Sequence, residues 1–199
     1  RLSYYKNEVD KKYNKLLATI DTPLWHKDRS KETSAGNFIS DVLLHAIGLQ
    51  DHIVFTHGGF TRTNFIDTQI TLKAVNETWP FTDGLHSIEV QGKHVKELLR
   101  KNVEQIGSDF FCCMSSNINI IVQNTKIAEI THNDSIIDDD AFYSLVFSSY
   151  TLDMMTANSF IDEMHSKNKK LIIPNTNQAI MNVMSDDFKY SIKDRISFV

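Results

Sequence analysis

Helix-like and strand-like apolar patterns alternate along the whole chain, and this alternation limits the possible folds more than any other feature. Apolar residues at steps of three and four predict helices at 38–47 and 94–105. Short apolar runs predict strands at 53–55 and 142–147. Interleaved helices and strands, with hairpin-like strand pairs in the second half, predict an α+β fold. We therefore expect a single domain in which helices pack on the faces of a mixed β-sheet.

Several shorter elements and the two ends complete this prediction. Leu2 to Leu17 carries the spacing of an amphipathic helix, either part of the domain or the tail of a connector from a preceding domain. We therefore divide the chain into a connector helix at 1–20 and a folded domain at 21–199. The shorter predicted elements are strands at 18–25 (with Pro23 inside it), 85–90, 118–122, 126–131 and 170–173, a strand or helical turn at 70–75, and helices at 158–165 and 179–184.

Composition excludes several classes of protein. Of 199 residues, 41% are hydrophobic and 23% are charged, which is typical of a folded globular protein. The net charge of -4 gives no basic surface for a nucleic acid polymer. No apolar run approaches the roughly 18 residues of a membrane span. The adjacent Cys112 and Cys113 lack metal-ligand spacing, so we expect no zinc and no other cofactor in this fragment.

A glycine pair and an arginine follow the strand predicted at 53–55. Gly58 and Gly59 allow positive φ and close approach of the backbone to a bulky neighbour. Arg62 offers a planar fork of donors for a phosphate or carboxylate. Taken alone, this loop is better explained as a glycine turn followed by a solvated arginine than as a binding loop.

Segments spread over nearly the whole chain resemble, in order and spacing, the C-terminal domain of the 5′-nucleotidase and UDP-sugar hydrolase family. Residues 32–41 resemble its acidic-x-x-x-Gly-Asn helix start, and residues 57–62 resemble its Asn-Gly-Gly-Gly-Ile-Arg loop. Residues 79–83 are similar to its x-Pro-Phe-Gly-Asn segment. Residues 143–150 resemble the strand and aromatic residue before its Gly-Gly-Asp-Gly loop, and residues 194–196 resemble its ending.

This resemblance implies a division of labour between two domains. In the family, an upstream metallophosphoesterase domain holds two divalent metal ions and the catalytic groups, while the C-terminal domain binds the nucleotide. The present chain lacks the Asp-x-His and Gly-Asn-His motifs of the metal domain. We therefore expect no catalytic residues, no metal ligands and no activity in this fragment alone. Because Arg1 is not an initiator methionine, we expect a piece of a longer protein. The resemblance implies that this longer protein is a metal-dependent phosphoester hydrolase acting in nucleotide catabolism.

The resemblance also implies roles for particular residues. Family members are mostly exported, so an extracellular, cell-wall or periplasmic location is expected. By position, Arg29 and Arg62 match phosphate contacts of the family. Phe81 and Tyr150 match the two aromatic residues that sandwich the base. Thr156 stands where the family has an aspartate that binds the ribose hydroxyls. Without the resemblance, Arg29 would read as a solvated loop residue and Phe81 as a core residue. The candidate substrate-binding residues are Arg29, His57, Gly58, Gly59, Arg62, Phe81, Tyr150 and Thr156.

Some positions depart from the family pattern. His57 replaces an asparagine, Phe60 replaces the third glycine, and Met154 and Met155 fall where the Gly-Gly-Asp-Gly loop would lie. Thr156 offers a neutral hydroxyl in place of a carboxylate, which predicts altered sugar binding. A second interpretation therefore stays open, a non-catalytic ligand-binding or structural domain with a degenerate nucleotide site.

Overall fold

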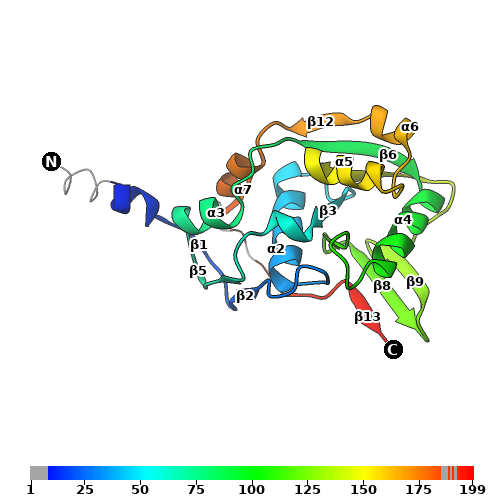
Figure 1. Ribbon diagram of the computed structural model, residues 1–199, viewed down its shortest axis with the longest axis horizontal. Helices are drawn as coiled ribbons and strands as arrows, with labels where there is room; N and C mark the ends of the chain where they lie inside the picture. The colour runs from blue at the N-terminus through cyan, green and yellow to red at the C-terminus, as the bar shows by residue number, and fades with distance from the viewer. Residues whose placement is uncertain (1–8, 185–187, 189, 191) are drawn as a thin grey trace.

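A five-stranded mixed sheet forms the centre of the chain (Figure 1). The computed structural model describes residues 9–184, 188, 190 and 192–199. Strand β11 pairs in parallel with β3 and antiparallel with β6. The mixed sheet predicted from the sequence is therefore confirmed. Its strand order is β12 (Lys170–Ile173), β6 (Leu85–Gln91), β11 (Phe142–Ser148), β3 (Ile53–His57) and β7 (Cys112–Met114).

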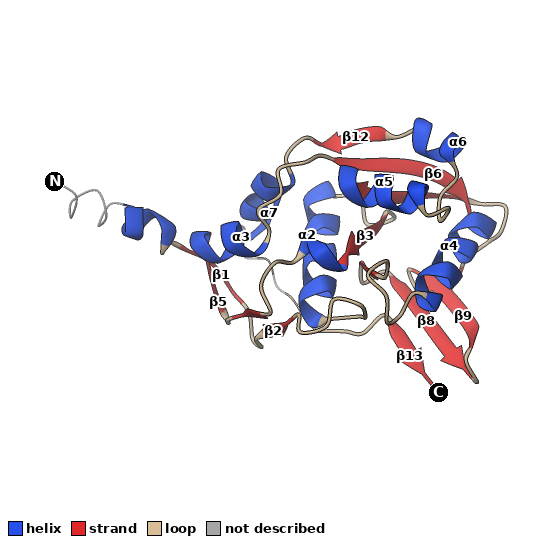
Figure 2. Ribbon diagram, viewed as in Figure 1, coloured by secondary structure: helices blue, strands red, loops and turns tan. Residues whose placement is uncertain are grey.

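The two faces of this sheet pack against different helices, because side chains alternate along each strand. Val54 of β3 faces the core that contains α2, α3 and α7. Ile53 and Phe55 face the other core, which contains α4 and α5. Figure 2 shows the helices distributed around the sheet. The helices are α2 (Ser34–Ile47), α3 (Leu72–Thr78), α4 (Gly92–Glu104), α5 (Ser149–Ala157), α6 (Glu163–Lys167) and α7 (Thr176–Met184).

Smaller sheets extend the fold at two places. A four-stranded sheet in the order β10-β9-β8-β13 packs into the core that contains α4 and α5, and its last strand comes from the end of the chain. Two-stranded sheets β1-β5 and β2-β4 lie near the N-terminal side (Figure 1). The strands are β1 (Leu16–Thr19), β2 (Leu24–Trp25), β4 (Phe65–Ile66), β5 (Gln69–Thr71), β8 (Ile118–Gln123), β9 (Lys126–His132), β10 (Ser135–Ile136) and β13 (Ile196–Phe198).

Two local predictions are wrong in their bounds. The helix expected from Leu2 to Leu17 is found at residues 9–13 of the described chain and ends before Leu16. Leu16–Thr19 instead pairs with β5, so a tertiary contact overrides the helical spacing, while residues 1–8 lie outside the described part. The helix expected at 158–165 is also wrong. Asn158 is the C-cap of α5, and α6 begins only at Glu163, after Asp162 caps it.

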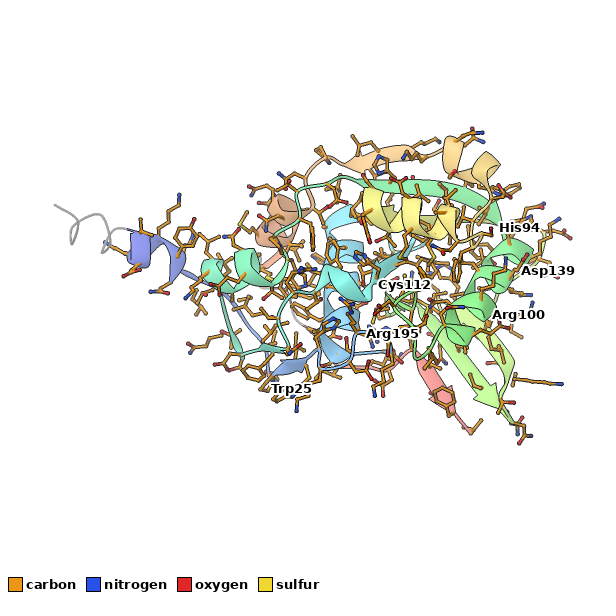
Figure 3. All side chains as sticks on the ribbon, in the orientation of Figure 1. Trp25, His94, Arg100, Cys112, Asp139 and Arg195 are labelled. Carbon is orange, nitrogen blue, oxygen red and sulfur yellow. The ribbon has the colours of Figure 1, made fainter. Side chains whose placement is uncertain are left out.

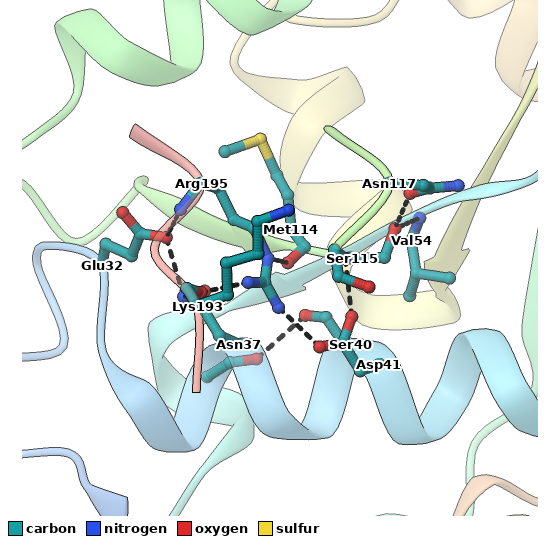
Figure 4. A network of polar contacts seen from close by, with 12 residues as sticks. Glu32, Asn37, Ser40, Asp41, Val54, Met114, Ser115, Asn117, Lys193 and Arg195 are labelled. Atoms are coloured by element: carbon teal, nitrogen blue, oxygen red, sulfur yellow. Dashed lines mark hydrogen bonds and ion pairs between the residues drawn. The ribbon is translucent and has the colours of Figure 1, made fainter. Parts of the chain in front are cut away.

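A buried polar network fastens the end of the chain to α2 (Figure 4). The Glu32 carboxylate accepts hydrogen bonds from the backbone N–H of Arg195 at 2.5 Å and of Ile196 at 3.2 Å. The Arg195 guanidinium donates to the Asp41 carboxylate at 2.5 Å and to the Met114 carbonyl at 3.3 Å. The motif-like segments 32–41 and 194–196 therefore meet in the fold, and their contacts hold α2 and the residues before it to the end of the chain.

Candidate functional site

A cleft of about 890 Å³ lies where parallel strands β3 and β11 end, at His57 and Ser148. Parallel strands bring their carboxyl ends to the same edge of a sheet, so the segments that follow them meet there. The wall of the cleft comes from five segments that are far apart in sequence. The lining residues are Arg29, His57, Gly59, Phe60, Arg62, Pro80, Phe81, Thr82, Asp83, Asp109, Phe110, Ser148, Ser149, Tyr150, Asp153 and Met154.

The glycine pair shapes one side of the cleft by close approach of the backbone. Gly58 and Gly59 begin a short 3₁₀ helix, η1 (Gly58–Phe60), and neither has the positive φ that the sequence suggested. Gly58 is needed for a different reason: a Cβ there would lie 2.1 Å from the Arg29 carbonyl oxygen. The buried His26 ring also ties these segments together, since its Nε2 lies 2.7 Å from the Gly58 carbonyl oxygen. Gly58 therefore sets the position of Arg29.

Both predicted phosphate-side arginines line the cleft and are exposed. Arg29 contacts the Asp109 carboxylate, with Nε 3.1 Å from Oδ1. Arg62 donates to the Gly59 carbonyl oxygen at 3.4 Å, and its Cζ lies 6.0 Å from the centre of the Phe81 ring. These contacts are few and long, so both guanidinium groups keep N–H donors for a ligand.

Aromatic rings connect the two residues expected to hold a base. Phe81 stacks on Phe60 at 5.3 Å between ring centres, and Tyr150 packs on the His57 ring at 4.8 Å. Phe60 and His57 meet edge to face at 6.2 Å. Phe60, which stands in place of the family's third glycine, has a buried side chain. Phe60 and His57 therefore support Phe81 and Tyr150 from behind, and Tyr150 itself is 62% exposed.

His57 stands at the centre of this wall in an uncharged form. Its Nδ1 lies 3.0 Å from the Thr151 hydroxyl oxygen. Burial, assisted by the positive charges of Arg62 and Arg29, lowers the pKa of His57 to about 4. At neutral pH its ring is therefore neutral and contributes hydrogen bonding and packing, but no positive charge for a phosphate.

The structure does not bring Thr156 to the cleft. Helix α5 begins at Ser149 because Ser148 caps it, accepting a hydrogen bond from the Thr151 N–H. Thr156 lies six residues after Tyr150, donates its hydroxyl hydrogen to the Leu152 carbonyl, and lines a different cavity of about 460 Å³. Asp153 and Met154, three and four residues after Tyr150, face the cleft instead.

Several cleft residues were missed by the sequence interpretation. Asp153 and Met154 follow from helical spacing once α5 is recognised, and Asp83 adjoins the predicted Phe81. Asp109 and Phe110 carry no local signal, because they reach the cleft from the loop after α4. Gly58 is buried just behind the lining. Within the described residues, no group of three or more His, Cys, Asp or Glu is arranged to hold a metal ion.

Comparison with known protein families matches residues 17–158 to the 5′-nucleotidase C-terminal domain. The chain belongs to this family. It is 34% identical over 119 residues to the trifunctional nucleotide phosphoesterase protein YfkN of Bacillus subtilis (strain 168), a match that covers 55% of this chain and 8% of YfkN. The resemblance drawn from the sequence motifs is thereby confirmed.

Solved structures agree on the fold. The NAD nucleotidase of Haemophilus influenzae superposes with a TM-score of 0.76 at 14% identity, over 99% of this chain and 40% of that one. The 5′-nucleotidase precursor of Thermus thermophilus superposes with a TM-score of 0.71 at 18% identity, over 100% of this chain and 42% of that one. The present chain thus spans less than half the length of each of these proteins. Among its described helices, none has the length and apolar character needed to cross a membrane.

Proposed function

We propose that the cleft binds the nucleotide substrate of a 5′-nucleotidase-like phosphoester hydrolase. In this proposal an upstream metallophosphoesterase domain of the same chain supplies two divalent metal ions and the hydrolytic chemistry. The observation that carries the proposal is the convergence of Arg29, Arg62, Phe81 and Tyr150 on one cleft. An exported protein acting on extracellular, cell-wall or periplasmic nucleotides fits this role.

The aromatic side of the cleft is suited to a nucleobase. Phe81 comes from the loop after α3 and Tyr150 from the first turn of α5. Phe60 packs on Phe81 and His57 packs on Tyr150, and these contacts reduce the side-chain entropy that is lost when a base stacks on the two rings. Stacking on aromatic rings stabilises a base by about 1–3 kcal/mol per contact and accepts different bases.

The arginine side is suited to phosphate. Arg29 and Arg62 both enter the cleft beside Gly59. Charge-assisted hydrogen bonds from guanidinium groups to phosphate are short, directional and stronger than neutral ones. The neutral His57 ring between the two sides can hydrogen-bond the sugar or the phosphate ester through Nε2.

Calorimetric titration with AMP and adenosine tests this assignment. Phe81→Ala and Tyr150→Ala should weaken both ligands by about 1–3 kcal/mol each. The exposed Phe142 lies outside the cleft lining, so Phe142→Ala serves as the matched aromatic control and should bind normally. If the folded wild-type chain binds no adenosine, the nucleotide site is refuted and the structural or non-catalytic interpretation replaces it.

A second series separates the two ends of the ligand. Arg29→Ala and Arg62→Ala should weaken AMP about tenfold, because each removes charged donors to phosphate. Adenosine affinity should stay unchanged. The exposed Arg100 on α4 lies outside the cleft, so Arg100→Ala is the charge-matched control.

A further inference from the structure

The Arg29 guanidinium already holds an anion of the chain itself. Its Nε lies 3.1 Å from Asp109 Oδ1 and its Nη2 lies 3.4 Å from Asp109 Oδ2. Two N–H groups thus face two carboxylate oxygens side by side, which is the arrangement a phosphate takes on a guanidinium. A ligand phosphate at Arg29 and the Asp109 carboxylate therefore compete for the same donors.

The pair is built so that its side chains can separate. The side chains of Arg29 and Asp109 are 57% and 70% exposed, and ion pairs this open to water are weak. Their backbones, by contrast, are linked. Gly107 N–H donates to the Ser30 carbonyl at 2.8 Å, and Ser30 is held by the Asp28 carboxylate through its N–H at 3.1 Å and its hydroxyl at 2.6 Å. Rotation of two side chains is therefore enough to open the pair.

We propose that Asp109 is an internal counter-ion of the phosphate site, a positioning residue that occupies Arg29 in the empty cleft and is displaced by the ligand's phosphate. This inference rests on the proposed nucleotide site. It makes the cleft bind phosphate less tightly than its two arginines alone would. It also favours departure of phosphate, because Asp109 pairs with Arg29 again as soon as the anion leaves. A neutral nucleoside does not compete with Asp109, so its affinity is independent of the pair.

The test titrates wild-type chain and Asp109→Asn with AMP, inorganic phosphate and adenosine. Asparagine keeps the size of the side chain but removes the charge that competes for Arg29. AMP and inorganic phosphate should bind about 3- to 10-fold more tightly to the variant. Adenosine should bind equally to both proteins. The gain in AMP affinity should also shrink as salt is raised, because screening weakens the competing pair.

Two further variants separate a local pair from a general charge effect. Asp139→Asn removes a similarly exposed carboxylate that pairs with Lys96 at 2.7 Å outside the cleft, and it should leave all three affinities unchanged. In an Arg29→Ala background, Asp109→Asn should no longer tighten AMP, because the partner it released is gone.

The possible results separate the counter-ion role of Asp109 from the alternatives. AMP and phosphate affinities that are unchanged, weakened or undetectable in Asp109→Asn would overturn the counter-ion role, and weakened adenosine binding would show direct contact of Asp109 with the nucleoside instead. A gain that persists without Arg29 would also overturn it. The proposed function is judged separately, by adenosine binding to the wild-type chain, since tighter phosphate binding by the variant requires no nucleoside site.

Discussion

Two arginine environments in this molecule differ in almost every physical respect. The Arg195 side chain is 1% exposed, and its guanidinium is fixed by the Asp41 carboxylate and by the Met114 and Lys193 carbonyl oxygens (Figure 4). The Arg29 side chain is 57% exposed and contacts the Asp109 carboxylate, whose side chain is 70% exposed. Both arginines were singled out by the same resemblance, Arg195 within a motif-like segment and Arg29 by its position before one.

The contrast shows how to separate a structural charge from a binding charge. A buried guanidinium must satisfy its donors within the protein, because an unpaired buried charge costs several kcal/mol. The Arg195 guanidinium accordingly donates to Asp41, Met114 and Lys193 in the interior, and it does not line the cleft. Burial also raises the pKa of Glu32, although N–H groups of Asn37, Arg195 and Ile196 oppose that rise. An exposed arginine keeps its donors, and Arg29 and Arg62 are exposed and line the cleft, so these two are the candidates for phosphate.

The largest effect that tests this contrast is on stability. Arg195→Ala leaves the Asp41 carboxylate buried without its partner, so we expect a loss of about 3–5 kcal/mol in the free energy of unfolding. Urea denaturation measures this loss. Arg100→Ala is the control: Figure 3 shows Arg100 on α4 at the edge of the molecule, and its removal should change stability by less than about 0.5 kcal/mol. Equal stability of the two variants would remove the distinction between buried and exposed arginines.

The next effect concerns the backbone that carries Arg29. A Cβ at Gly58 would lie 2.1 Å from the Arg29 carbonyl oxygen, so Gly58→Ala must push the two loops apart. We expect a loss of about 1–3 kcal/mol in stability together with weaker AMP binding. Gly59→Ala offers a matched comparison, because its Cβ would meet only the His57 ring, at 3.1 Å. If Gly58→Ala were as mild as Gly59→Ala, close packing of Gly58 on Arg29 would be refuted.

These examples also show what the sequence can and cannot predict. Helix α2 and strand β3 follow from their apolar spacing, because their buried stripes depend only on local order. The motif resemblance singled out residues that the fold brings to the ends of β3 and β11, but it did not predict that these two strands are neighbours. The glycine pair correctly indicated an unusual backbone, but close approach, and not positive φ, is the reason.

The missed features depend on contacts that no local pattern contains. Helix α5 has a weak apolar period and was not predicted from the sequence, so the turn of Asp153 and Met154 toward the cleft was not foreseen. Asp109 meets Arg29 across 80 positions of sequence. Charged residues on exposed loops carry no periodicity, so only the folded chain reveals such a pair.

A dependence of stability on pH, of intermediate size, distinguishes His57 in the wall of the cleft from the exposed arginines. The pKa of His57 is about 4 in the folded chain and near 6.5 when unfolded. As the pH falls, the unfolded chain therefore takes up a proton at this histidine before the folded chain does. The contribution of neutral His57 to the free energy of unfolding is fully present above pH 6.5 and falls as the pH drops toward 4. The slope should approach 1.4 kcal/mol per pH unit at most. His57→Gln should lose this part of the pH dependence, and an NMR titration midpoint near 6.5 for folded His57 would contradict it.

The smallest expected change in stability belongs to Arg62. Its side chain is exposed and makes one long hydrogen bond, to the Gly59 carbonyl oxygen, so Arg62→Ala should alter the free energy of unfolding by less than about 0.5 kcal/mol. The same substitution should nevertheless weaken AMP by about tenfold. Arg62→Lys should recover only part of that affinity, because a lysine keeps the charge but loses the planar pair of donors. Loss of stability without loss of AMP binding would reverse the assignment and place Arg62 with Arg195 as a structural residue. Substitution of a ligand-binding residue should therefore reduce affinity strongly and stability very little, whereas substitution of a structural residue should reduce stability.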